Sequence, residues 1–236
     1  MTRRTNSRLA GFTFLFYIAA GILSLVLFGQ ATGGEAIAAK LAGISQHATA
    51  VRLVIVLGLF QAFSALVLAV TLHALTREQD PDLALLGLAC RVGEGVIIGA
   101  GMQETLRLRW LATTTGANAP DAAAAHALGA FLLQGDPLTT ATFFAVGSTL
   151  FAWLMLRGRI IPLPLAWIGV VASVLLVVGL PLQLAGVLRG PLTQFLWLPM
   201  IAFEVPLALW LLVKGAAAPA PGHSLTSAGT GGGSSD

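Results

Sequence analysis

Hydrophobic residues along the chain are grouped into six long blocks that are separated by short polar segments. Each block is close to the roughly 20 apolar residues that a helix needs to cross about 30 Å of hydrocarbon. The blocks are continuously apolar rather than alternating, which favours helices over the strands of a β-barrel. The pattern therefore predicts an all-α, polytopic membrane protein, a bundle of six transmembrane helices. The predicted spans cover residues 9–29, 53–75, 83–105, 139–156, 163–185 and 192–213.

The polar segments divide the chain into a short N-terminus (1–8), a six-helix transmembrane domain (9–215) and a tail (216–236). The tail is rich in Ala, Pro, Gly and Ser, so we expect it to be disordered. The first apolar block is longer than the apolar region of a signal peptide, about 7 to 15 residues, so we expect it to be retained as a helix. Two longer connectors, 34–46 and 120–134, allow short interfacial helices, but we interpret them as loops that cap the bundle.

The composition agrees with a lipid environment. Hydrophobic residues make up 56% of the chain and charged residues only 10%, whereas a soluble domain has about 25% charged residues. The formal net charge is +3, but the basic residues lie at helix ends rather than in one stripe, which indicates membrane anchoring and no nucleic-acid partner. The single cysteine, Cys90, lies inside an apolar block, which excludes an internal disulfide bond and a metal site built from several cysteines.

The distribution of Lys and Arg predicts the orientation, because cytoplasmic loops carry more of them. With the N-terminus inside, the cytoplasmic side has the larger share, and an even number of spans places both termini in the cytoplasm. We therefore expect a multi-pass protein of the inner (plasma) membrane. The cytoplasmic residues in this scheme are Arg3, Arg4, Arg8, Arg77, Arg157, Arg159 and Lys214, and the outer ones are Lys40, Arg52, Arg107, Arg109 and Arg189.

Residues that support common membrane enzymes are missing from the spans. His47, His126 and His223 fall in predicted loops or the tail, and only His73 lies in a span, so the paired axial histidines of a membrane haem are not present. The sequence contains no H-E-x-x-H, G-x-S-x-G or P-loop pattern. We predict no catalytic residues, no metal site and no cofactor.

Three charged residues lie where charges are costly. Arg91 and Glu94 lie within the third block and Glu204 within the sixth, and a charge near the bilayer centre costs about 2.5 to 3.5 kcal/mol, so each needs a partner or a wet cavity. Arg91 and Glu94 are three residues apart and share a helical face. Counted at 1.5 Å per residue from the predicted cytoplasmic ends of their spans, all three residues lie roughly 12 to 16 Å into the membrane. This depth is near the middle of a hydrocarbon core of about 30 Å. We predict one cluster in which Arg91 bridges both carboxylates, with Gln61 and His73 as candidate polar neighbours.

Five short stretches give the chain a resemblance to a known family. They are Arg8-Leu-Ala-Gly11, Arg91-Val-Gly-Glu94, Phe143-Phe144, Arg157-Gly-Arg-Ile-Ile-Pro162 and the segment from Glu204 to Gly215. In this order and spacing the chain resembles the bacterial membrane family known as domain of unknown function 4386. In that family a basic residue typically follows the proline that matches Pro162, whereas this chain has Leu163. The resemblance implies a multi-helix membrane protein and no known activity.

Three functions remain open from the sequence. The leading hypothesis is a binding, sensor or accessory membrane protein without catalysis, in which a small molecule or an ion is a candidate ligand and the Arg/Glu cluster is either a packing contact or a site. The alternative is a small secondary transporter or proton-coupled carrier, since three plus three helices would place one carboxylate on the third helix of each half. An intramembrane enzyme is the third hypothesis, and it would need a nucleophile or metal that the sequence does not offer.

Overall fold

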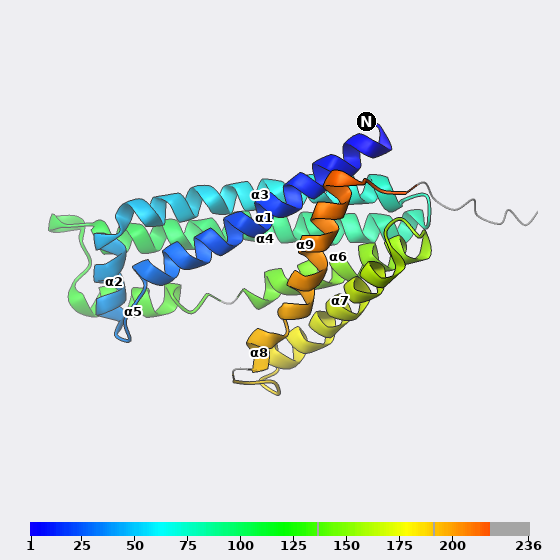
Figure 1. Ribbon diagram of the computed structural model, residues 1–236. Coiled ribbons are helices and arrows are strands. Elements are labelled where there is room, and N and C mark those ends of the chain that lie inside the picture. Colours follow the sequence, from blue (N-terminus) through cyan, green and yellow to red (C-terminus); the bar gives the residue numbers. More distant parts are fainter. Residues whose placement is uncertain (136, 191, 218–236) are drawn as a thin grey trace, which may run out of the picture.

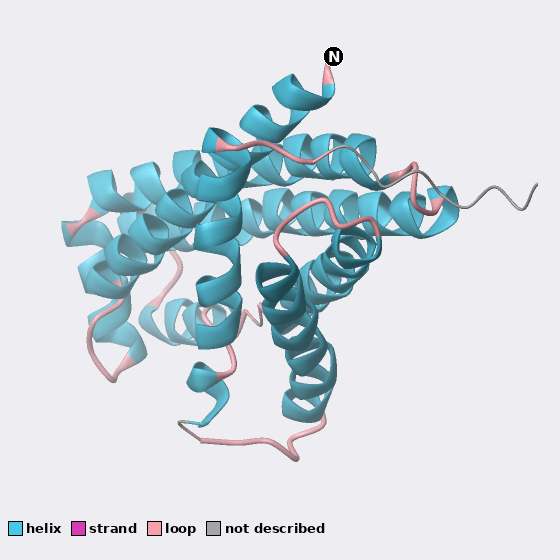
Figure 2. Cartoon of the chain, turned by 45° about the vertical axis from the view of Figure 1, so that its right-hand side comes forward, coloured by secondary structure: helices cyan, strands magenta, loops and turns pink. Residues whose placement is uncertain are grey.

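The computed structural model describes residues 1–135, 137–190 and 192–217. Within them every regular element is helical (Figure 2), and the fold is a polytopic membrane bundle, as predicted. The long helices are α1 (Arg3–Ala31), α3 (Ala48–Thr76), α4 (Pro81–Thr113), α6 (Leu138–Arg157), α7 (Leu163–Leu184) and α9 (Leu198–Val213). The short elements are α2 (Ile37–Gln46), η1 (Gly116–Asn118), α5 (Ala122–Leu132) and α8 (Leu192–Phe195).

Five of these helices, α1, α3, α4, α6 and α7, are long and apolar enough to cross a membrane. Their outward faces carry large exposed apolar side chains such as Leu25, Phe63 and Val171, which is the pattern expected of surfaces that contact lipid rather than water. The chain is therefore a membrane-spanning protein.

The sixth predicted span is shorter than expected. Residues 192–213 do not form one helix, because α8 ends at Phe195 and α9 begins at Leu198. Pro199 lies in the first turn of α9, where the missing N–H of proline is tolerated, whereas a continuous helix through this position would lose a hydrogen bond. The resulting α9 has 16 residues and is about 24 Å long.

The two longer connectors, 34–46 and 120–134, were interpreted as loops, and that interpretation is wrong. They contain α2 and α5, which pack against each other at the end of the bundle away from the N-terminus (Figure 1). Asp121 begins α5 by accepting a hydrogen bond from the Ala124 N–H at 2.7 Å, an N-terminal cap of the kind that aspartate favours. Pro120 precedes this cap and disfavours an earlier helical start.

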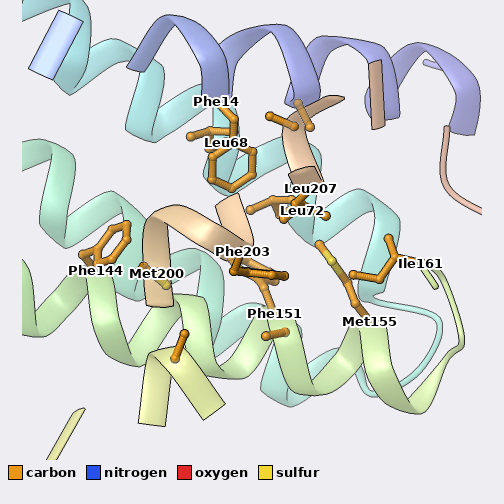
Figure 3. Close-up of a cluster of buried hydrophobic side chains, with 14 of the residues drawn as sticks. Phe14, Leu68, Leu72, Phe144, Phe151, Met155, Ile161, Met200, Phe203 and Leu207 are labelled. Atoms are coloured by element: carbon orange, nitrogen blue, oxygen red, sulfur yellow. The ribbon is translucent and has the colours of Figure 1, made fainter. Parts of the chain in front are cut away.

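The six long helices form a closed ring in which each packs mainly against two neighbours. The order around the ring is α1, α3, α4, α6, α7 and α9, and α9 then contacts α1 again. The chain thus forms two halves, α1–α3–α4 and α6–α7–α9, which meet where α4 packs against α6 and where α9 packs against α1. Buried apolar side chains from five of the helices fill the centre of the ring, including Phe14, Leu68, Phe151, Met155 and Phe203 (Figure 3).

The α1–α9 contact depends on a glycine. A Cβ atom at Gly11 would lie 2.5 Å from the carbonyl oxygen of Ala208 and 2.6 Å from the backbone nitrogen of Leu212. Neither backbone atom can move without shifting α9, so only glycine allows the two helices this close. Helix packing therefore explains the glycine of the stretch Arg8-Leu-Ala-Gly11, the first of the five that resemble the family.

The C-terminal segment is held against the N-terminus as it leaves α9. The Ala216 N–H donates to Ser7 Oγ at 3.0 Å, and Arg3 Nε donates to the Ala217 carbonyl at 2.9 Å. The first two residues of the predicted disordered tail are thus hydrogen-bonded to α1. The remainder of that prediction, residues 218–236, lies outside the described residues.

Candidate functional site

The three charged residues picked out from the sequence come together at the centre of the ring. Arg91 on α4 is 1% exposed, Glu94 on the same helix is fully buried, and Glu204 on α9 is 6% exposed. Arg91 Nη1 lies 2.8 Å from Glu94 Oε2, and Arg91 Nη2 lies 3.6 Å from Glu204 Oε1. One guanidinium therefore contacts both carboxylates, the first within its own helix and the second across the ring.

Two aromatic rings enclose the Arg91 guanidinium. Its Cζ atom lies 4.7 Å from the centre of the Phe144 ring on α6 and 5.7 Å from the centre of the Phe14 ring on α1. At these distances each ring face attracts the cation, and the attraction is stronger where water is excluded. Arg91 Nε has no hydrogen-bond partner among the described residues, so charge pairs and ring faces hold this side chain.

Tyr17 completes the cluster, and sequence reasoning missed it. Its hydroxyl donates a 2.6 Å hydrogen bond to Glu94 Oε1, so both oxygens of Glu94 are bonded, one to Tyr17 and the other to Arg91. Tyr17 is the only tyrosine in the chain and lies in the middle of the first span. This position was a usable signal, because tyrosines in transmembrane helices are commoner near the two membrane–water interfaces than in the middle of the membrane.

A cavity of about 460 Å³ lies beside the cluster. This volume falls within the range of about 300 to 1,000 Å³ that is usual for small-molecule sites. Glu94, Glu204 and Tyr17 line one part of it, and Pro137 at the start of α6 and Thr193 in α8 line another part. The cavity therefore runs from the buried carboxylates to the connecting segments of the second half of the chain.

The cavity wall is mostly apolar with a few polar groups. Gln61, which the sequence offered as a polar neighbour, lines the cavity, whereas His73, offered for the same role, does not. His73 lies in the last turn of α3, too far along the helix to reach the cavity. Further polar groups that sequence reasoning did not single out are Thr140, Gln183 and Thr193, and the apolar wall includes Ile98, Leu138, Ala141, Phe144, Trp197, Met200 and Ile201.

The spaces on the two sides of the cluster differ greatly in size. A second cavity of about 630 Å³ adjoins the first through shared wall residues Ile98, Pro137 and Thr140, and it reaches Glu104. On the other side of the cluster, Arg91 and Glu204 line a void of only about 10 Å³. The charged cluster therefore lies between a cavity large enough for a ligand and a void that is too small for one.

No group of three or more His, Cys, Asp or Glu side chains that could hold a metal ion occurs in the part of the chain that the structure describes. The site offers two carboxylates, one guanidinium, one phenol and several amides and hydroxyls. Such a set can bind and orient a ligand through charge and hydrogen bonds.

Comparison with known proteins gives one match. A family model described as "Domain of unknown function (DUF4386)" matches residues 9–215, the whole chain apart from its first eight residues and the tail. No curated protein and no solved structure matches the chain.

Proposed function

Since the chain belongs to the family of domain of unknown function 4386, whose description assigns no activity, we propose that it binds a small organic ligand in the membrane without catalysis. The ligand would occupy the cavity that ends at Glu94 and Glu204. The observation that carries this proposal is the cavity itself, because a cluster that served only as a packing contact would be enclosed by side chains on every side. Instead, Glu204 and Glu94 form part of the wall of a space large enough for a ligand.

The architecture supports this proposal. Ligand sites in helical bundles lie between helices and combine an apolar wall with a few polar groups that fix orientation. Here Tyr17 and Arg91 fix the Glu94 carboxylate, so the polar end of the site is preorganised before a ligand arrives. A preorganised site loses less free energy on ordering when it binds.

A screen for ligand-induced stabilisation tests the proposal. The purified full-length chain in detergent would be heated with each member of a library that contains equal numbers of organic cations, anions, zwitterions and neutral compounds. A ligand that binds only the folded state raises stability by RT ln(1 + [L]/Kd), about 2.7 kcal/mol at a hundredfold excess over Kd.

Two tryptophan variants localise any effect. Thr140→Trp fills the cavity, because Thr140 lines it, whereas Val178→Trp adds the same side chain on the exposed face of α7. We expect at least one compound that stabilises the native chain and Val178→Trp but not Thr140→Trp. If no compound stabilises the native chain, or if Thr140→Trp responds as the native chain does, the proposal is wrong.

A carrier is the second candidate function, and the ring of helices favours it. The third long helix of each half packs against the first long helix of the other, α4 against α6 and α9 against α1, and each third helix carries one glutamate of the cluster. Inverted-repeat carriers place their site between two such halves and open it to one side at a time. Uptake of the ligand by proteoliposomes, compared with protein-free liposomes, separates a carrier from a protein that only binds.

We also propose that the protein lies in the inner (plasma) membrane with both termini in the cytoplasm. The Lys and Arg distribution supports this orientation, and the cavity would then extend from the carboxylates towards the outer side. The lipid bilayer and the small ligand are the partners that this proposal includes.

A further inference from the structure

The charged groups on the cavity walls are all acidic. Glu94 and Glu204 line the first cavity and Glu104 lines the second. No Lys, Arg or His side chain is among the described residues that line either one. A ligand in either cavity therefore meets only negative charge among these wall residues, and a cavity with low-dielectric walls concentrates such a field.

The one cation of the cluster is directed away from the cavity. Arg91 is not a lining residue of the first cavity but lines the small void beyond it. Its guanidinium is held between Phe14 and Phe144 and is bonded to Glu94. An anionic ligand would have to pass the two carboxylates to reach it, so the arrangement disfavours anions.

Glu204 is the carboxylate that remains available. Its distance to Arg91 is 3.6 Å, against 2.8 Å for Glu94, and Tyr17 bonds only Glu94 among the described residues. One guanidinium shared by two carboxylates leaves one negative charge without a cation when all three groups are ionised. The side chain of Glu204 is 8% exposed and lines the cavity, so a ligand can reach it.

Aromatic side chains lie on the same wall. Phe144 and Trp197 form a tilted ring pair with centroids 5.9 Å apart, and both line the cavity with Tyr17. Aromatic faces beside a carboxylate are the usual combination for recognising ammonium groups. Leu138, Met200 and Ile201 add an apolar surface for the rest of such a molecule.

From this arrangement we infer that the ligand is a monovalent organic cation, an ammonium group attached to an apolar body. The ammonium group would lie against Glu204 and the ring of Trp197, both of which line the cavity. This inference rests on the proposed function, since it names the chemical class of ligand for the same cavity.

Matched compounds test the charge directly. Phenyltrimethylammonium, the uncharged tert-butylbenzene of the same shape, and the anion benzenesulfonate would be titrated into the full-length protein in detergent, and affinities derived from the rise in thermal stability. Thr140→Trp serves as the reference for partitioning into micelles. We expect the cation to bind at least about 10-fold more tightly than either of the other two compounds, about 1.4 kcal/mol.

Two carboxyl variants locate the interaction. Glu204→Gln should reduce the affinity for phenyltrimethylammonium to that for tert-butylbenzene. Glu78→Gln, a change at an exposed carboxylate paired with Arg3, should leave it unchanged. An unchanged affinity in Glu204→Gln would contradict the inference.

The outcomes separate this inference from the proposal on which it rests. If the cation shows no preference over the two matched compounds, the cation assignment is wrong, whether or not other compounds bind. Stabilisation by an anion or a neutral compound that Thr140→Trp abolishes would then leave the proposed function standing without its cation. If no compound of any charge stabilises the protein, both fail.

Discussion

Replacing Arg91 by alanine should be the most damaging single change in the centre of the ring. The change removes the one cation that the described residues place beside two buried carboxylates, and it leaves an empty volume between the rings of Phe14 and Phe144. Removing one partner of a buried ion pair costs about 3 to 5 kcal/mol. Contacts in membrane proteins are usually weaker than this, so we expect a loss of about 3 kcal/mol in the free energy of unfolding.

The two carboxylates should couple to Arg91 unequally. Glu94 lies 2.8 Å from the guanidinium and Glu204 3.6 Å, so the Arg91–Glu94 coupling should approach the largest values measured between membrane helices, about 1.7 kcal/mol, and the Arg91–Glu204 coupling should be near the mean of about 0.6 kcal/mol. Glu204→Gln should cost less than Arg91→Ala, because Arg91 and Glu94 still compensate each other in that variant.

Unfolding in mixed micelles with increasing sodium dodecyl sulfate, followed by tryptophan fluorescence, measures these free energies in a double-mutant cycle. The matched control is Arg157→Ala. Arg157 pairs with Asp80 at 3.5 Å on the surface and its side chain is 54% exposed, so its loss should cost less than about 1 kcal/mol. If Arg91→Ala costs no more than Arg157→Ala, or if the Arg91 and Glu204 effects add strictly, the central cluster is not a set of interacting charges.

Four further predictions concern the rest of the cluster, the helix packing, the orientation and the metal content. Tyr17→Phe removes a 2.6 Å hydrogen bond to a carboxylate and should lower the unfolding free energy by about 1 kcal/mol, which the same micelle titration measures; no loss would mean that the bond contributes nothing. Gly11→Ala, in which the new Cβ meets the α9 backbone, should cost about 1 to 3 kcal/mol, whereas Gly29→Ala, which meets nothing within 4 Å, should be neutral or slightly stabilising; equal effects would contradict the close contact. In a background without the native cysteine, an impermeant thiol reagent on spheroplasts should label Ala123→Cys but not Thr5→Cys, both exposed positions, and the reverse would invert the proposed orientation. Purified protein should carry no stoichiometric haem or transition metal, which an absorption spectrum and elemental analysis would check.

Much of this fold could be predicted because lipid imposes a simple length requirement on helices. The apolar runs identified the long helices, and the i, i+3 spacing of Arg91 and Glu94 was enough to place both side chains on one helical face. Equal depth in two different spans was enough to associate Glu204 with them. The break before α9 was missed because hydropathy continues through Pro199 and only the backbone chemistry of proline interrupts the helix.

Other features depended on three-dimensional information. Tyr17 bonds Glu94 because α1 passes α4 at that height, and no sequence spacing relates two helices that are so far apart along the chain. The cavity is the space left where α6 and α9 begin, so its existence depends on where these helices start rather than on any residue pattern. The helices α2 and α5 are an exception, because alanine has the highest helix propensity and the alanine content of their connectors was a usable signal.

The closed ring also bears on the order in which the chain is made. Because α1 is synthesised first and its partner α9 last, the bundle cannot close until translation of the transmembrane domain is complete. During that interval α4 carries its own ion pair, since Arg91 and Glu94 lie on one helix, and the helix can enter the lipid with its charges already neutralised. Glu204 lies on the last helix, so it approaches Arg91 after that guanidinium has already paired with Glu94. The final step of assembly therefore introduces the second carboxylate of the cavity wall.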